Sequence, residues 1–443
     1  MHVTRVGIIG GGIAGLVAAY ELAKAGLAVT VIESSGKLGG LAASFVIEDG
    51  HEIERYYHFI CKPDRTYFQM LQELGIHDRL RWATTDMGLF YDGRLYTLGD
   101  PVSVLLFPHL SIGDKLRFGW ATLAAKVRPP LSWQELEGIP ADEWLVREYG
   151  QRAYDILYRP LIEQKFRDYA HNISAAWMWA RFYRSGNSRT LTLKERLGYL
   201  ERGSQLYIDA LEHALRRMGA DIRTSATVQQ VVVEGKRAQG VVLNGDLLPF
   251  EYVISTVPVP FACQFLESLQ GAYFENLRQL KYIGAMVMLL RLKQRFSKYY
   301  WMNVSDARMD ISGIIEYTNL NPCAYLGGDS IIYVPQYLAA EHPLYHLPDE
   351  QLFELYCGYL TLINPEFEPS WVRQYWVHRD RYSQPICQVG FSNHKPDMQT
   401  PIDNLYLTDS CQLHPDDRAI SNSSDLGKKA ANLVLAQVRS AER

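Results

Sequence analysis

Cysteine is scarce in this sequence, and the cysteines it has are not paired. Six cysteines are spread over 443 residues, and no two of them form a Cys-x-x-Cys pair. Such scatter argues against a disulfide framework and against a structural zinc site, and it is typical of reduced intracellular thiols. We therefore expect a cytoplasmic protein without a bound metal.

Positive charge is not in excess, and long hydrophobic runs are missing. The formal net charge is −4, whereas a nucleic-acid-binding surface is usually basic, so we expect no nucleic-acid partner. No apolar run reaches the roughly 18 residues of a membrane span; the longest, residues 282–292, predicts a buried strand. No signal peptide is expected before the first strand. The sequence predicts a soluble protein and leaves contact with a membrane surface open.

A glycine-rich turn stands near the start of the chain, in the stretch VGIIGGGIAGL. The β-branched run before it predicts a buried parallel strand, and the apolar spacing after it predicts a helix over 13–25. The glycines fit G-x-G-x-x-G, whose members make a tight turn, admit a pyrophosphate and let the helix pack closely. Phosphate would also meet the free N–H groups at the helix N-terminus. The residues expected at the pyrophosphate are Gly10, Gly12, Ile13, Ala14 and Gly15.

The next predicted strand ends at Glu33, whose carboxylate can accept both hydroxyls of a ribose. The phosphorylated ribose of NADP is therefore disfavoured, while NAD and FAD remain open. A basic residue and a glycine pair follow directly, in SSGKLGG. This arrangement resembles the extended FAD fingerprint, usually G-R-x-G-G, of the superfamily of amine oxidases, protoporphyrinogen oxidases and phytoene desaturases. The resemblance implies FAD contacts from Glu33, Ser34, Lys37, Gly39, Gly40 and Leu41.

Two later segments resemble the same superfamily. Residues 198–243 resemble its middle block, which has a glycine turn, an amphipathic helix and two strands, and the resemblance puts the backbone of Val228 against the adenine. Residues 404–438 resemble its third FAD-binding segment, in which Asp409 would hydrogen-bond the ribityl chain. The helix that starts near Ile420 would face the flavin with its N-terminus. The glycine that usually precedes this aspartate is a threonine here.

The resemblance implies an α/β fold, with a Rossmann-type FAD-binding domain of the glutathione reductase type and an inserted α+β substrate domain. A small-molecule substrate would meet the flavin between the two domains, because ligands of such sheets lie at the carboxyl ends of the strands. The FAD-binding domain would comprise residues 1–95, 200–260 and 395–443, and the substrate domain 96–199, which has helical periodicity, and 261–394.

Few protein groups need to take part in flavin chemistry, because the flavin N5 accepts or donates the hydride. Where the superfamily has a residue pair beside the isoalloxazine, this sequence has Tyr57 and His58. His58 is a candidate general base, although packing in a strand of alternating aromatics would also explain the pair. Glu316 and Asn319, at the end of a predicted strand, are candidates for the polar end of a substrate pocket or for simple edge-strand polarity.

Three further features allow more than one interpretation. Cys387 lies near the position at which some amine oxidases hold the flavin covalently, but a buried thiol is expected here, and so FAD is expected to be non-covalent. Residues 100–127 predict a buried helix pair, with a membrane-surface segment that collects a lipid-like substrate as the alternative. A basic cluster would clamp a phosphate or carboxylate, or would be a solvated helix end: Arg181, Arg184, Arg189 and Lys194.

The sequence contains no second strand–GxGxxG–helix unit, and therefore no NAD(P)H site of the two-dinucleotide type. We expect an FAD-dependent oxidoreductase in which the flavin N5 accepts hydride from a small organic substrate. A redox-neutral mutase resembling UDP-galactopyranose mutase, acting on a sugar-linked substrate, is the first alternative. A non-catalytic FAD-binding protein is the second. The sequence indicates neither the substrate nor the oligomeric state.

Overall fold

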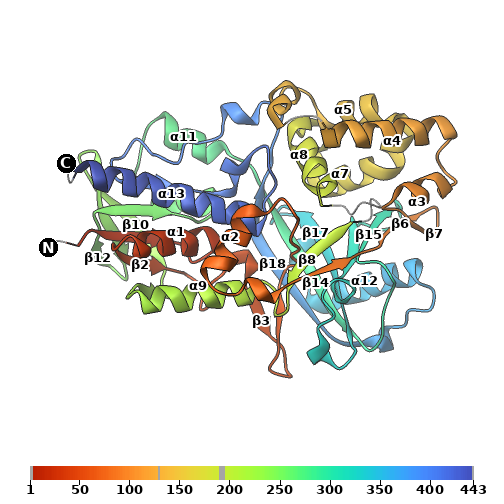
Figure 1. Cartoon of the computed structure of the whole chain (residues 1–443), viewed down its shortest axis with the longest axis horizontal. Helices are drawn as coiled ribbons and strands as arrows, with labels where there is room; N and C mark the ends of the chain where they lie inside the picture. The colour runs from red at the N-terminus through yellow and green to blue at the C-terminus, as the bar shows by residue number, and fades with distance from the viewer. Residues whose placement is uncertain (1–2, 128–129, 189–194, 442–443) are drawn as a thin grey trace.

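The computed structural model describes residues 3–127, 130–188 and 195–441. Figure 1 shows two parts side by side: a first lobe that holds both ends of the chain, and a second part in which a large sheet lies below a group of helices. The expected α/β architecture is confirmed, since a parallel sheet of Rossmann type forms the first lobe and a mixed sheet forms the second part.

The first lobe is built on a five-stranded parallel sheet with the strand order β19, β13, β1, β2, β9. The strand that carries the glycine turn therefore lies at the centre, between partners from distant parts of the chain. Alternate residues of β1 face opposite sides of the sheet, with Val6 and Ile8 in one core cluster and Ile9 in another. The strands are β1 (Arg5–Ile9), β2 (Ala28–Ile32), β9 (Asp221–Arg223), β13 (Tyr252–Ser255) and β19 (Leu405–Leu407).

Helices cover one face of this sheet, and a three-stranded antiparallel sheet covers the other. Two of the helices, α1 and α13, cross closely at Gly427. A Cβ at this position would lie only 2.4 Å from the carbonyl oxygen of Ala14. A side chain at Gly427 would push the two helices apart. The helices are α1 (Ile13–Lys24), α2 (Arg65–Glu73), α9 (Gln205–Arg217) and α13 (Ile420–Ala441), and the strands are β10 (Val228–Glu234), β11 (Arg237–Leu243) and β12 (Asp246–Pro249).

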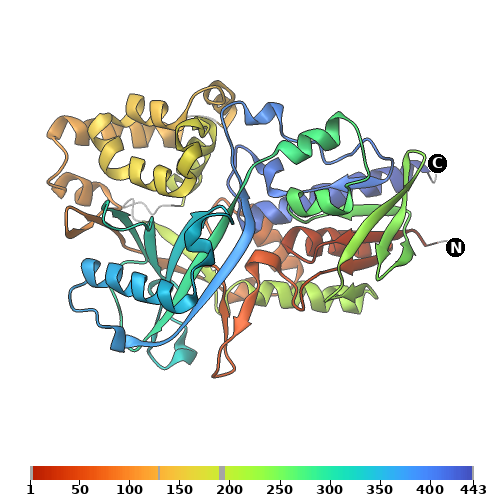
Figure 2. The ribbon, with the colours of Figure 1, turned by 180° about the vertical axis from the view of Figure 1, so that it is seen from behind.

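The second sheet has seven strands in the order β18, β14, β17, β16, β15, β6 and β7. Residues 282–292 form its buried strand β14, as the sequence predicts. Figure 2 shows the long strand β18 running from this sheet towards the first lobe. The strands are β6 (Met87–Tyr91), β7 (Arg94–Thr97), β14 (Tyr282–Leu292), β15 (Trp301–Ser305), β16 (Gly313–Glu316), β17 (Ser330–Leu338) and β18 (Val372–Pro385).

The sequence predicts that the first segment of the FAD-binding domain ends near residue 95, but the hydrogen bonds place part of this segment in the second sheet. β6 belongs to the second sheet, because its backbone pairs with β15 and not with a strand of the first lobe. A second pairing, between β5 and β8, and the hairpin β3–β4 connect the two parts. These strands are β3 (Ser44–Val46), β4 (Glu52–Glu54), β5 (Leu80–Thr84) and β8 (Arg196–Leu200).

Residues 101–186 form a group of helices, which we call the helical cap, as their periodicity predicts. Within the described residues, no helix is both long enough and apolar enough to cross a membrane. The cap comprises α3 (Pro101–Leu106), α4 (Ile112–Val127), α5 (Ala141–Tyr149), α6 (Gln151–Ala153), α7 (Arg159–Phe166) and α8 (Ala175–Gly186); the remaining helices are α10 (Val259–Phe265), α11 (Ala272–Gln279) and α12 (Asp349–Ile363).

The close crossing of α1 and α13 predicts that Gly427→Ala destabilises the fold. The added methyl group would meet backbone at Ala14, and overpacking of this kind costs about 1–3 kcal/mol. Urea denaturation measures the loss in the free energy of unfolding. The matched control is Gly358→Ala, in α12, where a Cβ has open space, so the change there should be below about 1 kcal/mol and stabilising. Equal effects of the two substitutions would contradict the prediction.

Candidate functional site

The three glycines of the turn between β1 and α1 have different surroundings. Gly10 has a φ of 105°, and its N–H donates to the Ile32 carbonyl oxygen over 2.8 Å. A Cβ on Gly15 would lie 2.0 Å from the Gly10 carbonyl oxygen, whereas a Cβ on Gly12 would meet nothing within 4 Å. The turn therefore packs tightly on one side and leaves open space at Gly12, next to the first N–H groups of α1.

Glu33 follows β2 and lies beside this turn. Its carboxylate accepts hydrogen bonds from the N–H groups of Gly11, over 2.7 Å, and Ser35, over 2.8 Å. The hydroxyl of Ser34 lies 3.4 Å from the same carboxylate. The Ala226 N–H donates to the Glu33 carbonyl oxygen, which brings the start of β10, where Val228 stands, alongside the end of β2. The structure thus brings the predicted ribose and adenine residues together.

The second glycine pair packs against the first turn. The Gly39 N–H donates to the Gly11 carbonyl oxygen over 2.8 Å, and a Cβ on Gly40 would lie 3.3 Å from the Gly12 Cα. Leu41 follows and is half-buried. Lys37, by contrast, forms an ion pair of 2.7 Å with Glu52 on the β3–β4 hairpin, so its ammonium group is directed at that carboxylate.

Asp409 follows β19 at the same edge of the sheet and is buried. Its carboxylate accepts hydrogen bonds from the Cys411 N–H (2.6 Å), the Val259 N–H (2.8 Å) and the Tyr282 hydroxyl (2.9 Å). Burial raises the pKa of this carboxyl above its ordinary value. A ribityl hydroxyl would share these acceptor oxygens, and the role of Asp409 towards a cofactor stays a prediction. Ile420, the first residue of α13, is half-buried.

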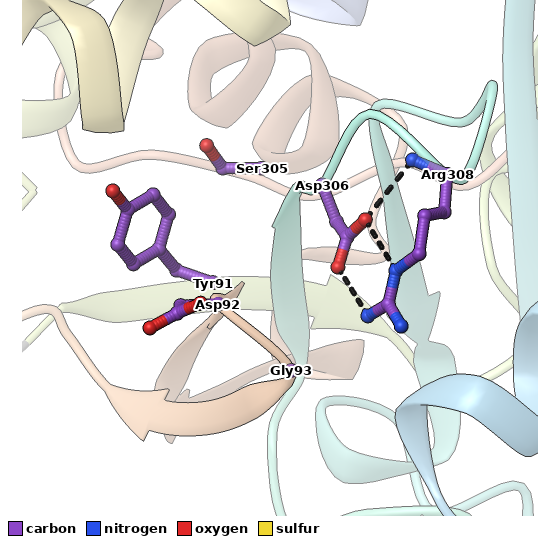
Figure 3. A pocket seen from close by; sticks show the side chains of 6 residues that line it. All are labelled: Tyr91, Asp92, Gly93, Ser305, Asp306 and Arg308. Carbon is purple, nitrogen blue, oxygen red and sulfur yellow. Dashed lines mark hydrogen bonds and ion pairs between the residues drawn. The ribbon is translucent and has the colours of Figure 1, made fainter.

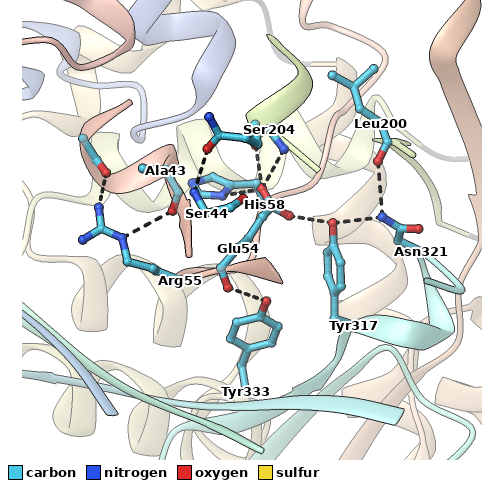
Figure 4. A network of polar contacts seen from close by, with 12 residues as sticks. Ala43, Ser44, Glu54, Arg55, His58, Leu200, Ser204, Tyr317, Asn321 and Tyr333 are labelled. Carbon is cyan, nitrogen blue, oxygen red and sulfur yellow. Dashed lines mark hydrogen bonds and ion pairs between the residues drawn. The ribbon is translucent and has the colours of Figure 1, made fainter. Parts of the chain in front are cut away.

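A buried carboxylate that the sequence analysis did not single out, Glu54, joins three parts of the chain (Figure 4). The Ser204 N–H and hydroxyl donate to it over 3.0 and 2.6 Å, and the Tyr317 hydroxyl donates over 2.6 Å. The Tyr333 hydroxyl donates to its backbone oxygen over 2.8 Å. Burial alone would raise the pKa of Glu54, but the donors, His58 among them, hold it below its ordinary value. Glu54 is therefore an ionised group, only 3% exposed.

The carboxylate of Glu54 also explains why the turn of the middle block needs a glycine. Gly203 has a φ of 63°, and a Cβ there would lie 2.7 Å from the Glu54 Cδ. Ser204 stands where the superfamily usually has a second glycine, and its hydroxyl supplies a donor to Glu54. Nothing in the sequence pattern points to Glu54 itself, because a charged residue in a short strand is usually solvated.

His58 and Tyr57 lie next to this network. The Nδ1 of His58 donates to the Glu54 carboxylate over 3.1 Å, which orients the ring and leaves Nε2 available. The Tyr57 ring packs edge-on against Trp301, with 5.3 Å between ring centres. Burial, together with the neighbouring Tyr337 hydroxyl, raises the pKa of Tyr57 well above its ordinary value. The pair thus combines a fixed imidazole with a phenol that stays protonated.

Glu316 has a different environment from the one expected. Its carboxylate, 1% exposed, accepts hydrogen bonds from the Phe296 N–H (2.9 Å), the Ser297 N–H (2.7 Å) and the Ser330 hydroxyl (2.7 Å). Asn319 donates to the backbone of the same loop. Both side chains therefore fix the loop that begins at Phe296, and the structure does not bring them to His58. This correction follows from burial, which requires the carboxylate to find protein donors.

The predicted basic cluster divides into two ion pairs. Arg184 binds Asp64 through two nitrogens, at 3.2 and 2.9 Å, and so ties α8 to the segment before α2. Arg181 forms a 2.5 Å ion pair with Asp417, just before α13. The other members, Arg189 and Lys194, lie outside the described residues.

Arg181 belongs to a second group of cations that the sequence did not indicate. The Lys165 Nζ lies 4.5 Å from the ring centre of Tyr337 and 4.9 Å from that of Trp177. The guanidinium of Arg181 lies over the Trp177 ring, and that of Arg418 over the Tyr337 ring. Burial and the charges of the two arginines hold the pKa of Lys165 well below its ordinary value. The helical cap, β17 and the segment before α13 therefore place three basic side chains around two aromatic rings.

A hollow of about 410 Å³ lies elsewhere, at the turn between β6 and β7 and the end of β15 (Figure 3). Arg308 there is held by Asp306, with 2.6 Å between Nη2 and Oδ2. None of the predicted site residues lines this hollow. We assign no function to it.

Known proteins resemble this chain over most of its length. Residues 13–432 match the family of flavin containing amine oxidoreductases. The 15-cis-phytoene desaturase of Synechococcus elongatus is 22% identical over 464 residues, which cover 98% of this chain and 96% of that protein. The match to the family extends over almost the whole chain, and the resemblance noted in the sequence is confirmed.

Solved structures share the fold. The crystal structure of a proposed protoporphyrinogen oxidase from Exiguobacterium sp. 255-15 superposes with a TM-score of 0.76 at 20% identity, covering 99% of this chain and 100% of that one. Reduced UDP-galactopyranose mutase superposes with a TM-score of 0.75 at 17% identity, covering 98% and 96%. The same fold thus serves different reactions. The chain belongs to the flavin containing amine oxidoreductase family and is a flavin-dependent oxidoreductase.

Proposed function

We propose that the chain binds FAD non-covalently at the carboxyl edge of the five-stranded sheet and oxidises a small organic molecule beside it. The observation that carries the proposal is the open space at Gly12 next to the closed packing at Gly15, the combination that a pyrophosphate-binding turn requires. Burial raises the pKa of the Cys387 thiol above its ordinary value, and this disfavours the thiolate that a thioether bond to the flavin would need. The buried thiol therefore supports non-covalent FAD. The absence of disulfides among the described cysteines supports a cytoplasmic location.

The residues around the turn suit the successive parts of FAD. The N–H groups of Ile13 and Ala14 would bind the pyrophosphate at the N-terminus of α1, Glu33 the ribose and the Val228 backbone the adenine. The N-terminus of α13, at Ile420, would stabilise negative charge on the flavin ring. The other proposed cofactor contacts are Gly10, Ser34, Lys37, Gly39, Gly40, Leu41 and Asp409.

The chemistry needs a hydride acceptor, which the bound flavin would supply at N5, and a place for a substrate proton. We assign the proton to the Nε2 of His58, because the ionised Glu54 holds the other ring nitrogen. The Tyr57 hydroxyl, kept protonated by burial, would donate a hydrogen bond to the substrate. C–H and C–N bonds whose cleavage releases a proton are the substrate class that this pair supports.

The cations around Tyr337 and Trp177 favour a substrate with a carboxylate or phosphate. Arg181 is paired with Asp417, while Lys165 and Arg418 lie over the Tyr337 ring. Burial and the two arginines hold the pKa of Lys165 below its ordinary value, and an anionic ligand would stabilise its charged form. A sugar nucleotide carries such a group. A redox-neutral mutase reaction is therefore our second candidate function.

Gly12→Leu is expected to lower FAD affinity at least about tenfold without unfolding the protein, because the side chain would fill the space left for the pyrophosphate. The ratio of FAD to purified protein, from absorbance, measures the loss, and the melting temperature of the FAD-free protein checks the fold. Gly138→Leu, at an exposed glycine that also has open space, is the control. Full FAD occupancy in Gly12→Leu would contradict the proposed site.

The choice between oxidation and isomerisation is testable with the flavin as the indicator. We expect an amine or an activated C–H compound, from a panel that includes carboxylated and phosphorylated members, to bleach the oxidised flavin without oxygen. The mutase alternative requires turnover of a sugar nucleotide only after reduction with dithionite. A panel without any bleaching, combined with such turnover, would replace the first function by the second.

His58→Gln is expected to slow bleaching by the active compound about 10²-fold or more, the typical contribution of a general base. FAD content should stay unchanged, because the cofactor contacts proposed above do not include His58. Stopped-flow absorbance measures the rate constant of reduction. His213→Gln, at an exposed histidine on α9, is the control; equal rates for the two variants would remove His58 from the mechanism.

A further inference from the structure

The outer face of α3 and α4 is unusually apolar. Seven of the thirteen exposed large apolar side chains among the described residues lie between positions 102 and 123. Leu106 is 76% exposed, Ile112 78% and Trp120 73%. Together they form a surface that we call the apolar face, made of Val102, Leu105, Leu106, Ile112, Leu116, Trp120 and Leu123. Exposed apolar residues in one contiguous set mark an interaction surface more often than scattered ones do.

The apolar face is separate from the core side of the same helix. Ala121 is buried in the core cluster and Phe118 packs against it, so α4 has one apolar side turned inward. Ile112, Leu116, Trp120 and Leu123 recur at spacings of four, four and three residues and therefore share the opposite side. The sequence predicts a buried helix pair here, with a membrane-surface segment as the alternative. Only one side of α4 is buried, because α4 has more apolar positions than its contact with the cap can cover.

The charges of the segment that carries the apolar face have a small positive excess. Residues 100–127 contain three basic residues and two acidic residues, although the whole chain has a net charge of −4. Lys115 donates to the Leu105 carbonyl oxygen, and Arg117 donates to carbonyl oxygens at the end of α5. Both acidic residues are engaged locally: Asp114 accepts hydrogen bonds from Ser111, and Asp100 accepts from the first N–H groups of α3. Lys115 thus lies beside an exposed leucine, and neither carboxylate is without a donor.

We propose that the apolar face docks on the surface of a lipid bilayer that contains anionic lipid. An apolar helix side with a tryptophan and flanking cations is the composition of helices that lie in the membrane interface. Since no described helix is able to cross a membrane, the contact would be peripheral. Figure 1 places α3 and α4 at the end of the molecule away from both chain termini.

This contact would also give the cap a role in substrate delivery, an extension that rests on the proposed function. α4 packs against α8, which carries Arg181 and Trp177 of the cation group. The segment facing the lipid is therefore in direct contact with a wall of the candidate substrate site. An amphiphilic substrate with an apolar body and an anionic end would suit both surfaces.

The test is co-sedimentation of the FAD-loaded protein with phosphatidylcholine vesicles, with and without phosphatidylglycerol. We expect binding to the vesicles that contain phosphatidylglycerol, weakened by about 0.5 M NaCl, which screens the basic residues. The double variant Leu116→Glu/Trp120→Glu should bind at least about tenfold more weakly, because it removes two anchors and adds two repelled charges. FAD content and melting temperature should not change, since both side chains are exposed.

Met218→Glu/Leu247→Glu is the matched control, because it places two acidic groups at exposed apolar positions of the first lobe. Equal binding of the two double variants would overturn the proposal, as would absence of binding by the unmodified chain. Analytical ultracentrifugation without lipid provides a further arm. A dimer that Leu116→Glu/Trp120→Glu dissociates would assign the apolar face to a second copy of the chain and also overturn it. Each of these results is independent of whether the FAD-loaded protein oxidises any compound.

Discussion

The carboxylate of Glu54 is the contact on which the arrangement of the two parts depends. It is ionised and buried, and its donors come from the middle block, through Ser204, and from the residue that follows β16 of the seven-stranded sheet, Tyr317. A buried charge is tolerated only where hydrogen bonds replace its lost water, and removing one partner typically costs about 3–5 kcal/mol. The same carboxylate holds His58. The orientation of His58 is thus set by the same carboxylate that joins the first lobe to the seven-stranded sheet.

Much of the first lobe is predictable from the sequence, because local rules decide it. A β-branched strand, a glycine turn and an apolar helix face specify β1 and α1 within a few residues. The steric reason for Gly15 is likewise local, because a Cβ there would lie 2.0 Å from the Gly10 carbonyl oxygen. Gly203 is visible as part of a motif too, although the group that a Cβ there would meet, Glu54, comes from a distant segment. Glycines of this kind are visible in a sequence as motifs before their neighbours are known.

The polar groups of the candidate substrate site are harder to predict, because tertiary contacts place them. Glu54, Lys165 and Arg418 are single charged residues in unremarkable sequence surroundings. The packing of distant segments buries Glu54 and half-buries Lys165 and Arg418. Glu316 illustrates the opposite case: its position at a strand end makes it a candidate pocket group or an edge-strand residue, whereas it holds a neighbouring loop. Where a charge is solvated in most proteins, sequence alone gives no sign that it is not.

The close passage of α13 over α1 has a consequence for how the protein is made. The central strand β1 pairs with β13, some 250 positions later, and α13 comes after both sheets and the cap have been synthesised. Contacts so distant along the chain form late in folding. The turn at Gly12 therefore lacks the neighbouring helix α13 while the polypeptide is being made. The cofactor would bind after the two sheets and the helical cap have formed.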